Sequence, residues 1–81
     1  MWGLVVSDYK REVLCLIGQN VRSHRQAEKM TQEALAEAAN LSEKHLSAVE
    51  NGRLENISIG YLIDIAEALS IDYKKLLEEK S

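Results

Sequence analysis

A pair of short helices joined by a tight turn is the feature that most constrains the fold of this chain. It lies in residues 31–52, where Thr31 and Ser42 each occupy a helix N-cap position, eleven residues apart. The hydroxyl group of such a residue accepts a hydrogen bond from a free N–H group of the first helical turn. The spacing predicts helices over about residues 32–39 and 43–51, with Asn40 turning the chain between them. Helices this short do not persist alone in water, because nucleation is costly, so tertiary packing must hold both.

The second of these helices has one apolar side and one small, polar side. At about 100° per residue, Leu46 and Val49 fall on the apolar side. The polar side carries Glu43, Lys44, Ser47 and Ala48. A unit of this size is commonly used to set its second helix into the major groove of DNA. Any exposed helix also has a polar side, so the periodicity alone leaves DNA reading and simple solvent exposure equally open.

The segment before the pair predicts one long helix. Ser7-Asp8 stands at an N-cap position, and apolar residues follow at helical spacing to about Ala27. Gly18 lies within this helix, where glycine costs about 1 kcal/mol relative to alanine. We therefore expect a neighbouring helix to approach closely at Gly18. Residues 1–7 are expected to form an apolar N-terminal extension before a domain over residues 8–81.

The segment after the pair predicts two more helices. Gly52 suits the left-handed position that ends a helix, Ser58 then caps a fourth helix, and Asp72 caps a fifth over about residues 73–79. The fourth helix is expected to present one continuous core stripe formed by Ile59, Leu62, Ile63, Ala66 and Leu69. Eighty-one residues with 46% hydrophobic content and no proline suit one small helical domain. The sequence therefore predicts an all-α, five-helix fold.

Charge is distributed unevenly along the chain. The net charge of −3 taken alone argues against a nucleic-acid binder, because neutralising phosphates supplies much of the affinity for DNA. Residues 1–53 are neutral, with seven basic and seven acidic residues, and the acidic excess lies in residues 54–81. A DNA-binding face can therefore coexist with an acidic far side, with modest and salt-dependent affinity per subunit.

Several other classes of protein are disfavoured. A single cysteine rules out an internal disulfide and fits a reducing compartment, and the apolar start is too short for a signal or membrane segment. We therefore expect a cytoplasmic protein without a membrane partner. Cys15, His24 and His45 lack metal-ligand spacing, and no catalytic motif or phosphate-binding glycine loop is present. We expect no enzyme activity, no metal and no cofactor, and an unreactive Cys15 that is exposed or at an interface.

Residues 17–77, roughly three quarters of the chain, resemble the phage repressor and Cro-like helix-turn-helix family, also called the Xre family. The ordered set of motifs carries the likeness, rather than any one of them. The matching pieces are Ile17-Gly18, Val21-Arg22 and Arg25; Met30-Thr31-Gln32 and Leu35-Ala36; Leu41-Ser42, Leu46, Val49 and Glu50-Asn51-Gly52; and Ile65-Ala66, Ala68-Leu69 and Ile71. The chain departs from the family at Asn56-Ile57, where relatives often have proline, and at Ser70, where many have glycine.

The resemblance implies that the polar side of the second helix reads bases. Lys44 would donate to guanine, Glu43 would accept from a cytosine amino group, Ser47 would take either role, and the methyl group of Ala48 would touch a thymine methyl. The DNA backbone would be contacted by Gln32, Asn51 and Arg53, and Gln32 would also brace the recognition helix. Arg22 and Lys29 are equally compatible with ordinary surface. The resemblance also implies a partly buried ion pair between Arg25 and Glu50, which we interpret as structural.

We expect a sequence-specific transcription regulator that acts as a homodimer on a palindromic operator in double-stranded DNA, as a restriction-modification controller or phage-type repressor does. An activator would also contact RNA polymerase. The alternative is an antitoxin that holds a toxin protein through its long first helix. Apolar candidates for the dimer contact lie near both ends of the chain: Trp2, Leu4, Val5 and Tyr9, or Ile71, Leu76 and Leu77. The resemblance favours the second set.

Overall fold

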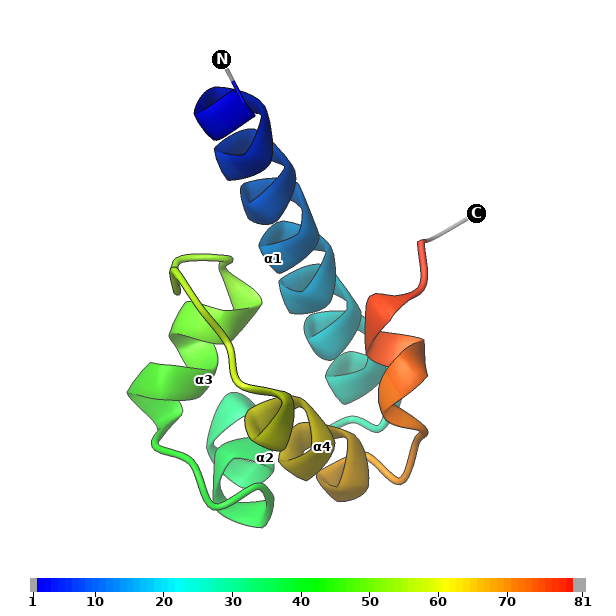
Figure 1. Cartoon of the computed structure of the whole chain (residues 1–81). Helices are drawn as coiled ribbons and strands as arrows, with labels where there is room; N and C mark the ends of the chain where they lie inside the picture. The colour runs from blue at the N-terminus through cyan, green and yellow to red at the C-terminus, as the bar shows by residue number, and fades with distance from the viewer. Residues whose placement is uncertain (1, 80–81) are drawn as a thin grey trace.

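The computed structural model describes residues 2–79, with side-chain environments from Asp8 onward, and these residues form helices without any strand (Figure 1). The elements in chain order are α1 (Trp2–Ala27), α2 (Gln32–Ala38), α3 (Glu43–Glu50), α4 (Ile59–Ala68) and the short 3-10 helix η1 (Tyr73–Leu77). The all-α prediction is confirmed. The expected fifth helix is η1, in which the Lys75 N–H donates to the carbonyl of Asp72, the three-residue spacing of a 3-10 turn.

The predicted helix caps are present. The side chains of Thr31, Ser42 and Ser58 accept hydrogen bonds from the N–H groups three residues ahead, over 3.0, 3.0 and 3.1 Å. Asn40 turns the chain with a φ of 60°, and Gly52 ends α3 with a φ of 66°. The local chemistry of these positions therefore sets the ends of α2 and α3 as predicted.

The first helix begins at Trp2, so the prediction that it begins at Ser7-Asp8 is wrong. No proline interrupts residues 2–7, and serine or aspartate within a helix costs only a few tenths of a kcal/mol. A possible capping residue therefore does not force a helix to begin. Residues 2–7 belong to α1, and Figure 1 shows that its first turns project beyond the other elements. No helix of the described residues is long and apolar enough to cross a membrane.

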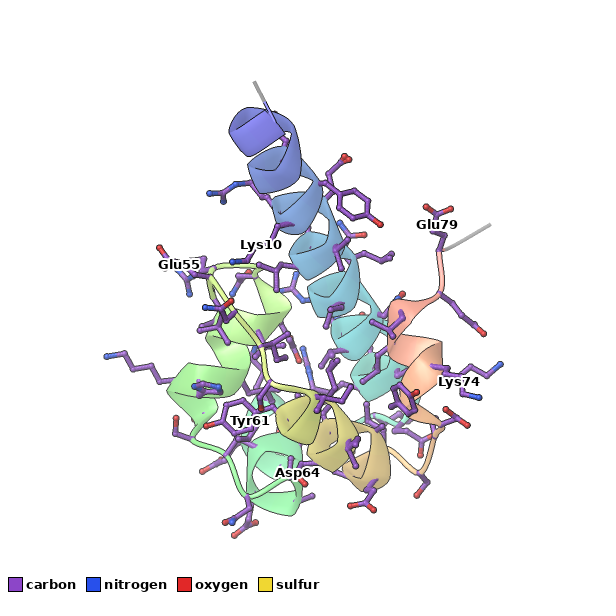
Figure 2. All side chains as sticks on the ribbon, in the orientation of Figure 1. Lys10, Glu55, Tyr61, Asp64, Lys74 and Glu79 are labelled. Atoms are coloured by element: carbon purple, nitrogen blue, oxygen red, sulfur yellow. The ribbon has the colours of Figure 1, made fainter. Side chains whose placement is uncertain are left out.

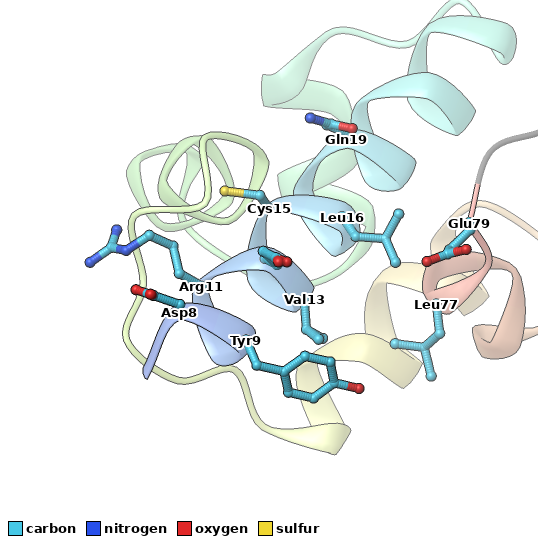
Figure 3. Close-up of a pocket in the computed structure, with 10 residues that line it drawn as sticks. Asp8, Tyr9, Arg11, Val13, Cys15, Leu16, Gln19, Leu77 and Glu79 are labelled. Atoms are coloured by element: carbon cyan, nitrogen blue, oxygen red, sulfur yellow. The ribbon is translucent and has the colours of Figure 1, made fainter. Parts of the chain in front are cut away.

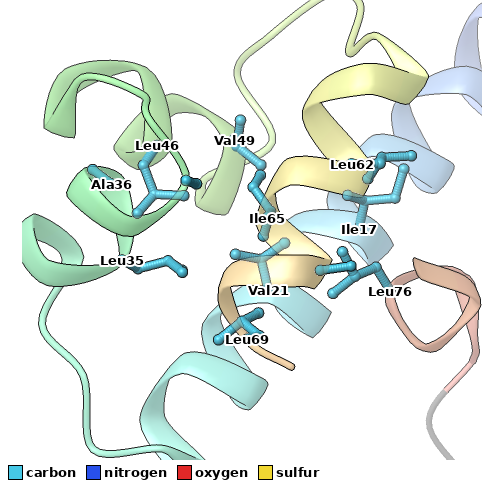
Figure 4. Close-up of a cluster of buried hydrophobic side chains, with 12 residues drawn as sticks. Ile17, Val21, Leu35, Ala36, Leu46, Val49, Leu62, Ile65, Leu69 and Leu76 are labelled. Carbon is cyan, nitrogen blue, oxygen red and sulfur yellow. The ribbon is translucent and has the colours of Figure 1, made fainter. Parts of the chain in front are cut away.

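Every element contributes one fully buried large side chain to a single core (Figure 4). These are Val21, Leu35, Leu46, Ile65 and Leu76, in the order α1, α2, α3, α4 and η1. Leu76 is therefore a core residue and not a free candidate for a dimer contact. The core must include η1, although that element is only five residues long.

The rotation of α4 differs from the predicted core stripe. Leu62, Ile65, Ala66 and Leu69 are buried, whereas Ile59 is 59% exposed and Ile63 is 40% exposed. The spacing of three and then four residues, from position 62 to 65 to 69, follows the helical repeat as closely as the predicted stripe does. Packing against the other elements selects between the two, so the sequence pattern alone does not.

Helices α1 and α3 approach closely at Gly18, as expected. A Cβ atom at this position would clash with the carbonyl oxygens of Val49 and Glu50 at the end of α3. The absence of a side chain at Gly18 therefore lets α1 support the last turn of α3. This contact sets the distance between α1 and the last turn of α3.

Candidate nucleic-acid interface

Helix α3 presents its polar side away from the core. Leu46, Val49 and Glu50 are buried, so they hold the helix to the rest of the domain. Glu43 and Lys44 are exposed, and Ser47 and Ala48 are partly exposed. The structure thus places the four residues predicted to read bases on one accessible strip, and α3 lies on the outside of the molecule in Figure 1.

Glu50, at the end of α3, is surrounded by hydrogen-bond donors. Its side chain is completely buried. Arg25 of α1 forms a bidentate ion pair with it, over 2.7 Å from Nε to Oε2 and 3.0 Å from Nη2 to Oε1. Gln32 donates from Nε2 to Oε1 over 3.0 Å, and Arg22 donates from Nε to the same oxygen over 3.4 Å. We refer to Glu50, Arg25, Arg22 and Gln32 as the Glu50 cluster.

The Glu50 cluster keeps the carboxylate ionised. Burial by itself raises the pKa of Glu50, but the hydrogen bonds from Arg25, Gln32 and Arg22, together with the charge of Arg25, outweigh burial and lower the pKa below its ordinary value. Arg25 also donates from Nη1 to the carbonyl of Met30 over 2.9 Å. One arginine therefore ties the end of α1 to the loop before α2 and to the end of α3.

The structure distributes the predicted backbone contacts among different environments. Gln32 and Arg22 belong to the Glu50 cluster, although Arg22 keeps 45% of its side chain exposed. Arg22 also donates from Nη2 to Oδ1 of Asn51 over 3.2 Å. Lys29 and Arg53 are exposed in loops, and neither forms an ion pair within the described residues. Arg22 and Asn51 are therefore brought together beside α3, whereas Lys29 stands apart at the end of α1.

Two further cations lie beside Arg53, and the sequence reasoning missed them. Lys10 and Arg11 of α1 line one shallow hollow together with Arg53 and Glu55, in the loop that follows α3. Figure 2 labels two of the residues that line this hollow, Lys10 on α1 and Glu55 on the loop that follows α3. Lys10 and Arg11 precede Arg53 by 43 and 42 positions in the sequence, so only the packing of α1 against α3 reveals the group.

A second, larger hollow runs along α1 and shares Arg11 with the first (Figure 3). It has a volume of about 890 Å³, its apolar lining includes Tyr9, Val13, Leu16 and Leu77, and charged side chains line it as well. Tyr9 is 68% exposed. Cys15 is exposed, in agreement with its expected place off the core stripe. Within the described part of the chain no cluster of acidic, histidine or cysteine side chains could hold a metal ion.

Helices α3 and α4 are joined by an aromatic contact. The rings of His45 and Tyr61 meet edge to face, with centroids 4.7 Å apart and an angle of 76° between the planes. Such pairs contribute about 0.5–1.5 kcal/mol beyond simple burial. The ring of His45 therefore packs against α4 and is not part of the polar strip of α3.

Comparisons with known proteins agree with this geometry. A model of the helix-turn-helix family HTH_3 matches residues 21–76. Control protein C.SmaI from Serratia marcescens is 36% identical over 62 residues, which are 76% of this chain and 73% of that protein. The immunity repressor protein of Bacillus phage phi105 is 37% identical over 65 residues, which are 80% of this chain and 44% of the repressor.

The fold also resembles solved structures. The restriction-modification controller protein C.AhdI from Aeromonas hydrophila superposes with a TM-score of 0.75 at 33% identity, covering 78% of this chain and 94% of that chain. Among curated relatives of the sequence, the chain spans between 28% and 73% of their length. The match covers nearly the whole of the C.AhdI chain and about three quarters of this one.

Proposed function

Because the chain belongs to the helix-turn-helix family HTH_3, whose members are DNA-binding transcription regulators, we propose that it binds a palindromic operator as a homodimer. We propose further that it regulates transcription by occupying that operator, in the manner of a small controller protein or a phage-type repressor. Two of the similar proteins are named as controllers and one as an immunity repressor, which supports both versions. The position of the operator relative to the promoter decides whether the bound protein blocks RNA polymerase or recruits it.

The accessible polar strip of α3 is the observation that carries this proposal. A recognition helix must expose small and polar side chains to base edges while its other side is held rigidly. In this chain Leu46 and Val49 anchor α3 in the core, and the Glu50 cluster anchors its end. Lys44 then donates to guanine. Glu43 accepts from cytosine and repels phosphates at sites where no such partner is present, which makes it a filter against wrong sequences.

Phosphate contacts flank the strip in this proposal. The amide nitrogen of Gln32 has two hydrogens and uses one for Glu50, so the other can reach a phosphate. Arg53 supplies an exposed cation just after α3, and Lys10 and Arg11 extend that basic group onto α1. These contacts position the protein without selecting sequence, and they compensate in part for the net charge of −3.

The dimer contact of this proposal lies on α4 and η1. Ile59 and Ile63 lie one helical turn apart and are 59% and 40% exposed, while Tyr73 and Leu77 on the neighbouring η1 are 36% and 39% exposed. Leu77 was already a candidate from the sequence, and Ile59, Ile63 and Tyr73 take the place of the buried Leu76. A single half-site read by one short helix seldom gives specific binding, so a second subunit at a spacing of about 34 Å is required.

Selection of bound duplexes from a random DNA pool, followed by sedimentation of the protein with and without the selected site, tests the proposal. We expect a palindrome and a dimer. Recovery of no preferred sequence would exclude specific recognition. A monomer at tens of micromolar under both conditions would exclude the dimer.

The second candidate is an antitoxin that also represses its own operon. The projecting first turns of α1 and the apolar hollow beside Tyr9, Val13 and Leu16 support it, because they offer a protein-binding surface away from α3. Neighbouring genes discriminate between the two candidates. A methyltransferase and an endonuclease would favour the controller, and a small toxin gene would favour the antitoxin.

A further inference from the structure

A chain of hydrogen bonds runs from the Glu50 cluster to the base-reading strip. Arg22 donates to Glu50 and, over 3.2 Å, to Oδ1 of Asn51. The Nδ2 atom of Asn51 in turn donates to the carbonyl oxygen of Ser47 over 2.8 Å, and lies 3.4 Å from the hydroxyl oxygen of Ser47. The side chain of Asn51, one helical turn after Ser47, is therefore held beside it.

The direction of each bond in this chain is set by the chemistry of its first member. An arginine side chain can only donate, so the oxygen of the Asn51 amide must face Arg22. The nitrogen of that amide then faces Ser47, which removes the usual ambiguity between the two ends of an asparagine side chain. Because an amide nitrogen also only donates, the hydroxyl oxygen of Ser47 is held as the acceptor.

The hydroxyl hydrogen of Ser47 remains unused. Serine within a helix often donates to the carbonyl four residues earlier, but no hydrogen bond from Ser47 to Glu43 or to another described residue is present. One lone pair of the oxygen is directed to Asn51. The hydrogen and the second lone pair face the accessible side of α3, and the bond that the oxygen accepts from Asn51 polarises the hydroxyl toward donating its hydrogen to a group outside the protein.

We propose that Arg22 and Asn51 set Ser47 as a hydrogen-bond donor, so that Ser47 selects a base edge that presents an acceptor. The acceptors in the major groove are N7 and O6 of guanine, N7 of adenine and O4 of thymine, whereas the amino groups of cytosine and adenine present donors. This inference rests on the proposed DNA reading by α3 and makes it more specific. Asn51 acts here as a positioning residue for Ser47, in addition to any contact with a phosphate.

The test uses the operator recovered by selection, with single base analogues placed at each position of a half-site. 7-Deazapurines, 2-aminopurine and 5-methyl-2-pyrimidinone remove the N7, guanine O6 and thymine O4 acceptors, whereas purine and 2-pyrimidinone remove the amino donors of adenine and cytosine. Affinity is measured for the wild-type protein and for Ser47→Ala. At one position, loss of an acceptor should weaken wild-type binding about fivefold, near the lower limit for a base contact, and should not weaken Ser47→Ala further.

Variants of the positioning residue separate this role from general weakening. Asn51→Asp presents an acceptor to Ser47 and adds a negative charge, so affinity should fall on every duplex and the coupling of Ser47 to the base acceptor should disappear. Asn51→Ala removes the donor without adding charge. In this variant, removing the base acceptor should change the affinity by less than about twofold more with Ser47 present than with Ser47→Ala. Arg53→Ala is the control, because it should weaken all duplexes and leave the coupling intact.

The outcomes distinguish this inference from the proposed function. The polarity assignment is overturned, while DNA reading stands, if a preferred sequence is recovered but Ser47 couples to an amino donor or to no base. Coupling as strong in Asn51→Asp and Asn51→Ala as in the wild type would overturn it as well. If no preferred sequence is recovered, the proposed function fails first, and the inference fails with it.

Discussion

Separating Arg25 from Glu50 should destabilise the domain severely. In Arg25→Met, the completely buried carboxylate of Glu50 keeps only Gln32 and the longer contact to Arg22. Removing one partner of a buried pair typically costs about 3–5 kcal/mol, because the remaining charge is left without compensation. A domain of this length has about 4–12 kcal/mol of stability in total, so the variant should be close to unfolding at room temperature.

The double variant Arg25→Met/Glu50→Leu should recover much of this loss, since replacing both members leaves no buried charge. The assay is urea unfolding followed by helical circular dichroism, with both single variants and the double variant compared in one cycle. Losses of only a few tenths of a kcal/mol that add in the double variant would show that the pair is unimportant and would refute the reasoning.

The stability that Glu50 confers also has a predicted dependence on pH. The folded-state pKa of Glu50 is lowered from its ordinary value of 4.5, so the ionised carboxylate stabilises the fold fully above that value. As the pH falls below 4.5 toward the lowered folded pKa, this stabilisation is lost. The difference in unfolding free energy between wild type and Glu50→Gln should therefore shrink in acid, and a constant difference from pH 7 to pH 3 would contradict the lowered pKa.

Four further predictions concern other parts of the molecule. Lys44→Ala should cost about 1–3 kcal/mol on the selected operator and relax the preference at one base pair, which competition with single-base variants of the operator measures. Arg53→Ala should weaken operator and scrambled duplexes equally and flatten the salt dependence by about one unit, as titrations over a range of salt would show. Ile63→Asp should produce a folded monomer in sedimentation, because it places a charge in the proposed dimer contact; an unchanged dimer would move the contact elsewhere. Gly18→Ala should destabilise by at least about 2 kcal/mol because of the clash with the α3 carbonyls. The matched change Gly60→Ala, which meets no atom closer than 3.7 Å, should stabilise α4 by about 0.5 kcal/mol in the same unfolding assay.

Features that depend on near neighbours in the sequence were predictable. The caps at Thr31, Ser42 and Ser58 and the left-handed end of α3 at Gly52 involve groups at most a few residues away, so the local pattern determines them. The beginning of α1 was not predictable in this way. Capping at Ser7-Asp8 competes with continuation of the helix, and the difference between the two is small.

Features that depend on packing were predicted less completely. The pairing of Arg25 with Glu50 and the bracing of the recognition helix by Gln32 came from the family resemblance. Nothing in the sequence showed that Gln32 and Arg22 both donate to the carboxylate of Glu50. The rotation of α4 was missed because two apolar stripes of similar quality exist on that helix. Lys10 and Arg11 escaped notice for the same physical reason, since their closeness to Arg53 exists only when α1 and α3 are packed together.

The contacts of Glu50 also determine how the folded domain opens. Its partners come from α1 and α2, so α3 cannot unwind without releasing donors on both of the other helices. Helices of seven and eight residues would exchange their amide hydrogens rapidly if each opened alone. We expect instead that the amides of α2, α3 and the last turns of α1 exchange together, with one shared opening free energy, while the projecting first turns of α1 exchange faster. Helix α3 is then either fully in place or absent, and a partly opened protein would lack the surface proposed to read DNA.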